Sequence, residues 1–343
     1  MENLNFQSPI NIVPSPIHPG RTYIGDQTGK IYILEDAEII RTIDLTPYIV
    51  PLKSKYDERG LLGMAINTEG RLFVFYSAPS PPTYANHLAE IVDDVPHVIL
   101  TVPKDNDIHN GGRLIFGPDD YLYLGLGDDG PQGDPFNHGQ RLDVVHGKIL
   151  RLDVTNQGSY TIPSDNPFRN VPGARPEIFA LGFRNPWGLS FDDTGRLFVS
   201  NVGWDHVETL FLVERGTNAG WNVREGSELA TWPAGPNESG ITLTPPIFQY
   251  THDWARKQQP EAKGVAIIGG INIGSDYIFG DYAGLIMAIS PNIDGVWSLK
   301  KITKLPGHVK MFGRDARGDL YATISPQSGP EEGRLINIDS FEV

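Results

Sequence analysis

The sequence predicts an all-β protein that folds as a six-bladed β-propeller. Glycine (38 residues) and proline (28 residues) make up about 19% of the 343 positions, against an average of roughly 12%, which predicts many turns. No long amphipathic helix is evident in the hydrophobic pattern. A polar turn followed by a short apolar or aromatic strand also recurs six times along the chain.

The spacing of the six repeats predicts the number of blades. The repeated strands cover residues 21–34, 70–76, 120–124, 195–200, 276–289 and 318–324. Their central positions are Tyr23, Phe73, Tyr123, Phe198, Ile278 and Tyr321, which gives steps of 50, 50, 75, 80 and 43 residues. A step near 50 fits one four-stranded blade, and longer steps fit blades with loop insertions. A β-sandwich with coincidental hairpins is the alternative.

We expect one propeller domain over residues 9–343. The proline-rich stretches at 78–82, 165–168 and 231–237 are short and flanked by strand patterns, as expected for loops rather than linkers. Residues 2–8 (ENLNFQS) differ by one residue from ENLYFQS, a protease site used for tag removal. Residues 1–8 are therefore interpreted as such a remnant or as a disordered N-terminus, with coincidence as the alternative.

Charge and composition exclude several functional classes. The net charge of −14 repels nucleic acid and anionic membranes, so we expect no nucleic-acid partner. The absence of cysteine excludes disulfides, thiolate catalysis and cysteine-ligated zinc. No apolar run approaches the roughly 18 residues of a membrane span. No signal peptide is visible after Met1.

The loop at residues 107–113 (DIHNGGR) concentrates chemical groups just before a strand–turn–strand unit. It holds a histidine, an acid, a base and two glycines. Glycine permits close approach of the backbone to a ligand. This loop is therefore the first candidate for a functional site.

Eight motifs carry a resemblance to a known family. They are residues 57–65, 109–114, 117–119, 127–130, 147–153, 184–188, 201–203 and 218–221. In this order they resemble the glucose/sorbosone dehydrogenase family of six-bladed propellers, and with the strand repeats the resemblance runs from about residue 20 to the C-terminus. The family includes soluble aldose sugar dehydrogenases that depend on pyrroloquinoline quinone (PQQ). It also includes a hedgehog-interacting-protein-like branch, whose members are not established quinoproteins.

The resemblance implies that His109 is a general base. Oxidation of a sugar at its anomeric carbon removes the hydroxyl proton while hydride leaves the carbon. An imidazole is suited to take that proton near neutral pH, and His109 matches the family's base. Asp107 or Asn110 is expected to orient the ring. The alternative is a histidine that only caps a turn.

The resemblance also implies cofactor and metal sites. Arg184 and Asn185 match a pair that contacts PQQ, where a guanidinium can bind a quinone oxygen or a carboxylate. Gly203 and Trp204 match the position at which backbone carbonyls bind Ca²⁺. The alternatives are a turn whose arginine pairs with a neighbouring loop, and an ordinary strand-end turn. Trp204 departs from the residues common in the family and requires an indole that points away.

The cationic positions near the C-terminus also depart from the family pattern. Where dehydrogenases typically have two closely spaced arginines for the PQQ carboxylates, this chain offers Lys310 and Arg314 at a different spacing, and Lys263 before them. We expect these three residues to bind the cofactor if they converge on one pocket. Separately, residues 128–134 hold oxygen-bearing side chains at close spacing, which suits either a structural Ca²⁺ site or an acidic turn.

These observations favour a dehydrogenase that oxidises an aldose with Ca²⁺ and PQQ and passes electrons to an external acceptor. The alternative is a non-catalytic propeller that binds a protein or glycan on its loop face. A metal-dependent lactonase ranks below both, because the motifs supply no carboxylate-rich metal centre. The resemblance implies an extracellular or periplasmic location. The motifs specify no particular sugar, electron acceptor or oligomeric state.

Overall fold

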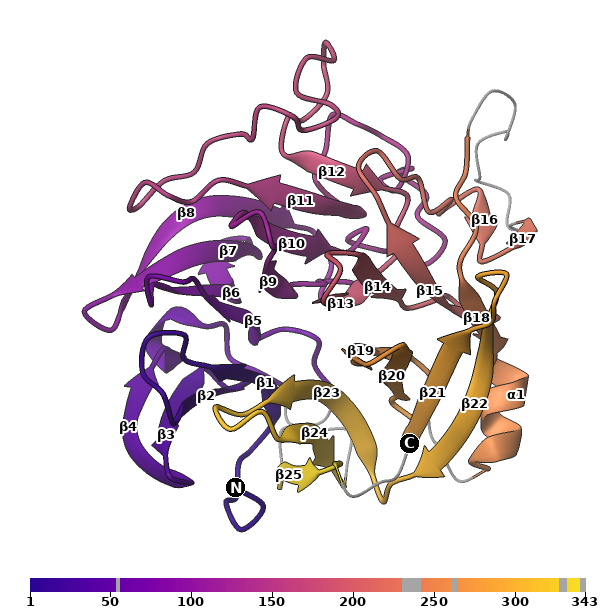
Figure 1. The fold of residues 1–343 in the computed structure, drawn as a ribbon. Helices are drawn as coiled ribbons and strands as arrows, with labels where there is room; N and C mark the ends of the chain where they lie inside the picture. The colour runs from indigo at the N-terminus through magenta and orange to yellow at the C-terminus, as the bar shows by residue number, and fades with distance from the viewer. Residues whose placement is uncertain (54–55, 230–241, 261–263, 327–331, 340–343) are drawn as a thin grey trace.

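Six antiparallel sheets surround a central axis in the computed structural model, so the predicted six-bladed β-propeller is confirmed (Figure 1). The structure describes residues 1–53, 56–229, 242–260, 264–326 and 332–339. None of the described helical segments has the length and apolar character needed to cross a membrane.

The blades follow one another along the chain. Blade 1 comprises β1 (Pro9–Pro14), β2 (Arg21–Asp26), β3 (Lys30–Glu35) and β4 (Glu38–Asp44), and blade 2 comprises β5 (Leu61–Ile66), β6 (Leu72–Ser80), β7 (Thr83–Val92) and β8 (Val95–Lys104). Blade 3 comprises β9 (Leu114–Phe116), β10 (Leu122–Leu126), β11 (Lys148–Leu152) and β12 (Ile178–Leu181), and blade 4 comprises β13 (Pro186–Phe191), β14 (Leu197–Asn201), β15 (Val207–Val213) and β18 (Phe248–Thr251). Blade 5 comprises β19 (Ile267–Ile273), β20 (Asp276–Asp281), β21 (Leu285–Pro291) and β22 (Trp297–Lys304), and the described part of blade 6 comprises β23 (His308–Arg314), β24 (Leu320–Ser325) and β25 (Arg334–Asn337).

The sequence repeat marks the second strand of every blade. Its six central positions lie in β2, β6, β10, β14, β20 and β24. These strands are buried along most of their length, because each has a strand on both sides and a neighbouring blade above and below. The two longest steps come from insertions in blades 3 and 4, where residues 127–147 follow β10 and the hairpin of β16 (Arg224–Glu225) and β17 (Glu228–Leu229) precedes β18.

Aromatic contacts join neighbouring blades. Phe198 of blade 4 stacks on Tyr277 of blade 5 with ring centroids 4.6 Å apart, and Tyr123 of blade 3 meets Phe191 of blade 4 edge-on at 5.1 Å. Such pairs contribute about 0.5–1.5 kcal/mol each beyond the area they bury. These contacts fix the relative positions of the loops that the blades carry.

The N-terminal residues connect the first blade to the last. Phe6, only 4% exposed, forms an antiparallel bridge with Gly333, which directly precedes β25. The backbone N–H groups of Gln7 and Ser8 donate to one carboxylate oxygen of Asp26, at 3.0 and 2.8 Å. The segment before β1 therefore packs against both blade 1 and blade 6.

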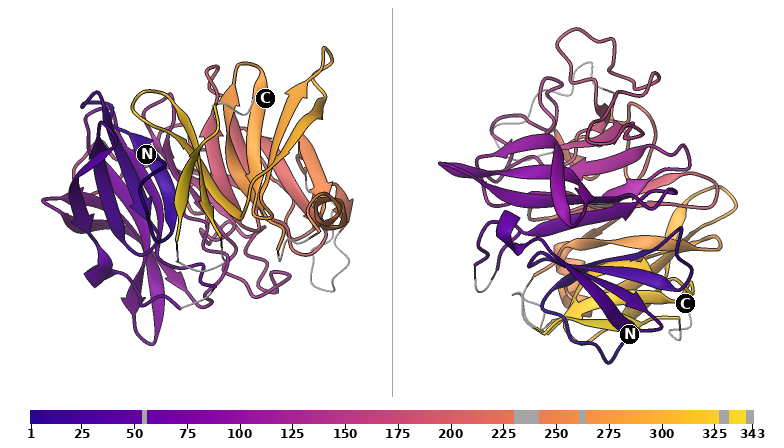
Figure 2. Two further views of the ribbon diagram at one scale, coloured as in Figure 1. Left: turned by 90° about the horizontal axis from the view of Figure 1, so that it is seen from below. Right: turned by 90° about the vertical axis from the view of Figure 1, so that its left-hand side faces the viewer.

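The first strands of the blades line the axis. β1, β5, β9, β13, β19 and β23 each contact their neighbours around the ring. The loops that enter these strands therefore meet at one face, together with the loops that leave the second strands. In the side view of Figure 2 (left), loops project from both faces of the ring. Besides β-strands, the described chain has a short 3₁₀ turn, η1 (Thr46–Tyr48), and one α-helix, α1 (His252–Gln258), beside blade 5.

Candidate active site

His109 is held at three points in the loop that enters β9. Its backbone N–H donates to Glu58 Oε2 at 2.7 Å. Its ring Nδ1 lies 2.6 Å from Asp128 Oδ1, and its Nε2 lies 2.8 Å from Arg184 Nη2. A guanidinium can only donate, so Nε2 accepts from Arg184 and the ring proton lies on Nδ1. The ring is 4% exposed and has one defined tautomer and orientation.

Asp128 orients this ring. It is fully buried, and it accepts further hydrogen bonds from Gly130 N at 2.8 Å and from Trp221 Nε1 at 2.7 Å. Burial acts to raise the pKa of Asp128, but the contact with His109 and the positive charge of Arg184 outweigh it and hold this pKa below its usual value. Asp128 therefore stays an anion beside the imidazole.

The expectation that Asp107 or Asn110 orients the ring is wrong. Asp107 is a partly exposed side chain that pairs with Lys53 at 2.7 Å and with Arg59 at 3.7 Å. The Asn110 side chain bonds to Tyr84 and to other groups around the loop. Asp128 comes instead from the insertion after β10, nineteen residues away from His109 in sequence.

Arg184 and Asn185 enter β13 beside the histidine. The backbone N–H groups of both residues donate to Asn201 Oδ1 at 3.0 Å, and Asn185 Oδ1 accepts from Gly111 N at 2.9 Å. The Arg184 guanidinium also donates to Gln132 Oε1 at 2.7 Å. Within the described part of the chain it has no acidic partner at ion-pair distance, and its buried Nε has no hydrogen-bond partner. It is a fixed positive charge that is not neutralised by contact.

The loop at Gly203 and Trp204 is shaped by one carboxylate. Glu225 Oε1 accepts N–H bonds from residues 204–207, at 2.7 to 3.2 Å. In a trans peptide the carbonyl points opposite to the N–H of the same unit, so the carbonyls of Gly203 and Trp204 are turned away from Glu225. A side chain at residue 203 would meet Val207 O at 1.9 Å, which explains why glycine is needed.

A second buried carboxylate ties this loop to blade 5. Glu208 accepts from Gly203 N at 3.1 Å and from Ile267 N at 3.0 Å, and it lies 2.7 Å from His252 Nε2. Burial acts to lower the pKa of His252, but the Glu208 contact outweighs it and raises this pKa. Glu208 therefore holds the loop at Gly203 against the start of β19.

Two of the three cationic residues near the C-terminus, Lys310 and Arg314, lie at different ends of β23. Lys310, near the start of β23, is 8% exposed and donates to Ser8 Oγ at 2.9 Å. Burial lowers the pKa of Lys310 to about 8. Arg314 lies at the other end of β23, where its Nη1 donates to Gly318 O at 2.7 Å across the turn to β24. The strand therefore carries Arg314 away from the face of His109 and Arg184. Lys263 lies outside the described residues.

The acidic stretch at residues 128–134 has the contacts of an acidic turn. Asp129 pairs with the buried Lys104 at 2.6 Å, and Asp134 accepts from the backbone N–H groups of His138 and Gly139. Burial and the charge of Asp128 raise the pKa of Asp134 to about 7. Over the described ranges, no three or more His, Asp or Glu side chains are grouped as metal ligands.

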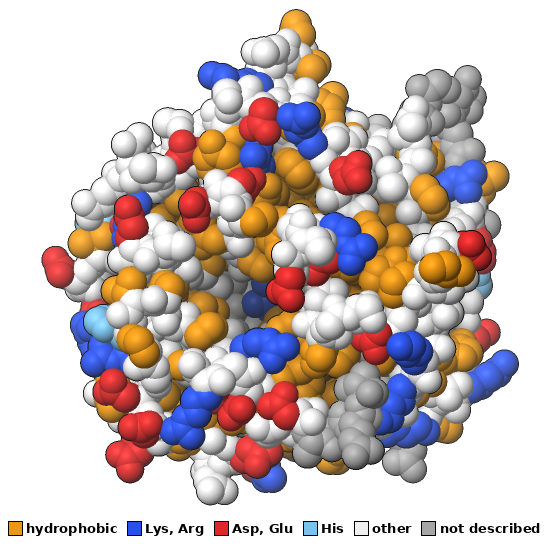
Figure 3. Space-filling view, in the orientation of Figure 1, with side chains coloured by type: hydrophobic (Ala, Val, Ile, Leu, Met, Phe, Trp, Pro, Cys, Tyr) orange, Lys and Arg blue, Asp and Glu red, His pale blue; other side chains and the backbone are white. Residues whose placement is uncertain are grey.

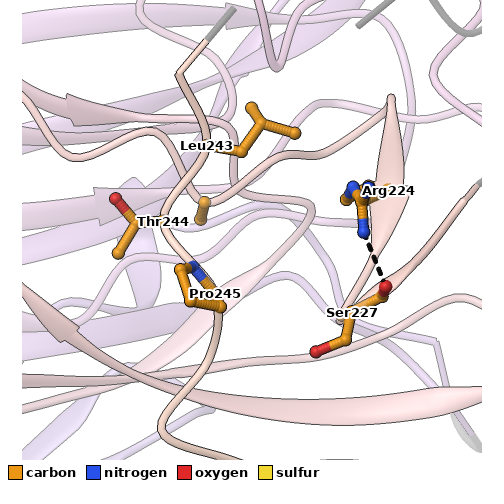
Figure 4. Close-up of a pocket in the computed structure, with 7 residues that line it drawn as sticks. Arg224, Ser227, Leu243, Thr244 and Pro245 are labelled. Carbon is orange, nitrogen blue, oxygen red and sulfur yellow. Dashed lines mark hydrogen bonds between the residues drawn. The ribbon is translucent and has the colours of Figure 1, made fainter.

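A separate pocket of about 300 Å³ lies on the outer side of blade 4 (Figure 4). It is lined by Ala219, Arg224, Gly226, Ser227, Leu243, Thr244 and Pro245. Arg224 donates to Ser227 O at 2.7 Å on one side of it. None of its lining residues belongs to the group around His109, so this pocket is not the site that the motifs predict.

Comparison with known proteins gives this geometry a family context. The sequence profile of "Glucose / Sorbosone dehydrogenase" matches residues 6–264. The HIPL1 protein of Arabidopsis thaliana is 28% identical over 87% of this chain and 53% of its own length. Aldose sugar dehydrogenase YliI of Escherichia coli is 34% identical over 52% of this chain and 40% of its own length. Human Hedgehog-interacting protein is 26% identical over 93% of this chain and 50% of its own length.

Solved structures share the fold. The putative oxidoreductase (glucose dehydrogenase) TTHA0570 of Thermus has a TM-score of 0.75 at 22% identity, covering 98% of both chains. The PQQ-bound aldose sugar dehydrogenase of Streptomyces coelicolor has a TM-score of 0.71 at 24% identity, covering 97% of this chain and 94% of that one. The chain spans about half the length of the curated relatives that it matches. The matched profile covers most of the chain, which therefore belongs to the glucose/sorbosone dehydrogenase family.

Proposed function

We propose that this chain is an aldose sugar dehydrogenase that uses PQQ and Ca²⁺ and passes electrons to an external acceptor. The observation that carries the proposal is the linked group of Asp128, His109 and Arg184, with contacts of 2.6 and 2.8 Å. It joins an oriented imidazole to a buried guanidinium that has no acidic contact partner among the described residues. The names of relatives such as YliI support the same reaction class.

His109 acts as the base through Nε2. Its Nδ1 proton is held by Asp128, so the lone pair lies on Nε2, on the Arg184 side of the ring. A sugar hydroxyl that replaces the Arg184 contact transfers its proton to this nitrogen as hydride leaves the anomeric carbon. The buried Asp128 carboxylate then stabilises the imidazolium that forms. When bound, PQQ supplies the two-electron acceptor for the hydride.

Arg184, Asn185 and Lys310 bind the anionic cofactor in this proposal. A tricarboxylate needs local positive charge in a protein whose net charge is −14. Arg184 fits this need, because its Nε is buried and has no hydrogen-bond partner. Lys310 is a second buried cation on the same side of the ring. Lys263 remains a predicted ligand, whereas the position of Arg314 argues against a direct contact.

Gly203 and Trp204 offer two backbone carbonyls to Ca²⁺. Their orientation away from Glu225 suits this role, because Ca²⁺ prefers oxygen ligands of this kind. Ca²⁺ takes about 6–8 oxygen ligands, so the others would come from the cofactor and from water. An extracellular or periplasmic site of action is part of the same proposal.

The test adds CaCl₂ and PQQ to the purified chain and measures quinone absorbance and sugar-dependent dye reduction. We expect saturable quinone binding and turnover with an aldose. His109→Asn is the decisive variant, because asparagine tolerates the positive φ of 53° at this position. It should keep PQQ binding and lose roughly a hundred- to ten-thousand-fold in kcat. His97→Ala, at an exposed strand position, is the control.

Two results would overturn the proposal. Failure of PQQ and Ca²⁺ to bind the folded protein would favour a non-catalytic propeller that binds a protein or glycan. Full activity in His109→Asn would remove His109 from the reaction.

A further inference from the structure

We propose that the cavity at the end of the axis opposite to His109 binds a small organic monoanion, a carboxylate with an apolar body. Arg113 is the residue that would bind the carboxylate. This site is distinct from the face that carries His109, Arg184 and Gly203, and it does not depend on the proposed dehydrogenase function.

The cavity has a volume of about 420 Å³ and is formed by all six inner strands. It is lined by Ile12–Pro16, Met64–Ile66, Arg113–Phe116, Gly188–Phe191, Gly269–Ile271, Met311 and Phe312. These positions are mainly apolar. The face drawn in Figure 3 is hollowed near its centre, where hydrophobic side chains surround the hollow. Small-molecule sites are typically of this size and apolar character, with a few placed polar groups.

Arg113 is the only charged side chain among the residues that line this cavity. It is 8% exposed and donates to Asn11 Oδ1 at 2.6 Å, to Ile10 O at 3.2 Å and to the sulfur of Met311 at 2.6 Å. All three acceptors are uncharged. Arg113 Nε and Asn11 Nδ2 are both buried without a hydrogen-bond partner. Of the two residues, Arg113 lines the cavity, so one guanidinium donor remains for a ligand.

The charge of Arg113 is not balanced in the described structure. Burial lowers its pKa to about 9, and no acidic side chain lies at ion-pair distance in the ranges described. Lys104 shows the contrast, because this cation is also buried and is paired with Asp129 at 2.6 Å. A buried charge without a counter-charge is costly. An anion bound at Arg113 would balance its positive charge, as Asp129 balances that of Lys104.

The chemistry of the cavity selects the class of anion. A guanidinium presents a planar pair of donors that matches a carboxylate. A single cation in a strongly acidic protein favours one negative charge over two or three. The apolar walls exclude a heavily hydrated body such as a sugar phosphate and suit a short alkyl or aromatic chain.

The test compares sodium octanoate with the neutral octanamide, by calorimetry and thermal shift on the protein without PQQ. The two probes share an alkyl chain and differ in charge. We expect saturable octanoate binding and a higher Tm. Octanamide should bind at least about tenfold more weakly, because it lacks the charged contact with Arg113. Equal binding of both probes, or no binding of octanoate up to its solubility limit, would overturn the proposal.

Variants locate the binding. Arg113→Gln should abolish the preference for octanoate over octanamide. Arg113 joins three strands, so Arg113→Gln could misfold, and a second variant is needed. Ile271→Trp fills the cavity from β19 and should weaken octanoate binding about tenfold or more. Ile273→Trp, on the same strand but outside the cavity and 39% exposed, is its matched control. Unchanged binding in Ile271→Trp would place the ligand elsewhere.

A competition experiment separates this site from the proposed cofactor site. Octanoate should not displace PQQ, because the two ligands would occupy opposite faces. Displacement would mean that octanoate binds at Arg184 or Lys310 and would overturn the assignment. Failure of PQQ to bind would leave the octanoate result intact, so the two proposals can fail independently.

Discussion

The two ends of the propeller axis place a buried arginine in different surroundings. At the face where the inner strands begin, Arg184 lies within a polar network with His109, Gln132 and Val202 O. At the other end, Arg113 lies at the floor of an apolar cavity, bound to Asn11, Ile10 O and Met311. Both guanidiniums lack a carboxylate contact in the described structure.

The difference follows from which parts of the chain build each end. The polar network is made by loops, including the long insertion after β10 that supplies Asp128. The apolar cavity is made by strands, whose side chains are set by packing between blades. Loops tolerate insertions and polar residues, so titratable groups gather where loops meet. The two ends are therefore expected to respond differently to substitution, and four predictions test this.

The largest effect is expected at Asp128. Asp128→Asn keeps the shape of the side chain but removes the charge that fixes the Nδ1 proton of His109. The wrong tautomer would leave Nε2 protonated and unable to accept the sugar proton, so kcat should fall roughly a thousand- to ten-thousand-fold. Steady-state kinetics measures kcat, and quinone absorbance should show that PQQ still binds. Asp193→Asn, in an exposed turn, is the control. A kcat near that of the parent would show that the ring orientation does not matter.

Replacing each of the two arginines with lysine tests the comparison directly. Arg184→Lys keeps a positive charge but loses the planar pair of donors, so we expect PQQ to bind roughly ten- to a hundredfold more weakly. Arg113→Lys should leave PQQ binding unchanged, because Arg113 lies at the other end. Fluorescence or absorbance titration of PQQ measures both variants. Equal loss of PQQ affinity in the two variants would mean that the two ends of the axis are coupled.

A smaller effect is expected at Glu225. Its Oε1 binds four backbone N–H groups, and Glu225→Gln replaces the charged acceptor with a neutral amide. Loss of charge-assisted bonds of this kind costs about 1–3 kcal/mol, so the Tm should fall. Ca²⁺ titration should also show weaker binding, because the carbonyls of Gly203 and Trp204 lose their fixed orientation. Glu228→Gln, exposed on β17, is the control. Normal Ca²⁺ affinity with a lower Tm would give Glu225 a purely structural role.

The strand pattern predicts nearly all of the architecture, because the repeat marks the second strand of each of the six blades. The loops were harder to predict. His109 and Arg184 are 75 residues apart in sequence, and only their motifs suggested that they belong together. The sequence places Asp128 in a stretch that suits either a structural Ca²⁺ site or an acidic turn, because sequence spacing cannot show which neighbour a carboxylate meets after a long insertion. Arg113 belongs to the candidate loop at residues 107–113, but the sequence carries no signal that its side chain is buried at the other end of the axis, and Glu225 lies in none of the motifs.

The smallest effect is a dependence of PQQ affinity on pH. Burial lowers the pKa of Lys310 to about 8, against the opposing charge of Asp26. Below this pKa the ammonium is charged and attracts a PQQ carboxylate, whereas above it the neutral amine does not. PQQ affinity should therefore weaken several-fold as pH rises through about 8, at constant ionic strength. A bound carboxylate favours the charged amine, so the transition in the complex should move to higher pH. Lys310→Met should bind more weakly and lose this part of the pH dependence, and octanoate binding at Arg113 should not show it. An unchanged PQQ pH profile in Lys310→Met would mean that Lys310 makes no contact with the cofactor.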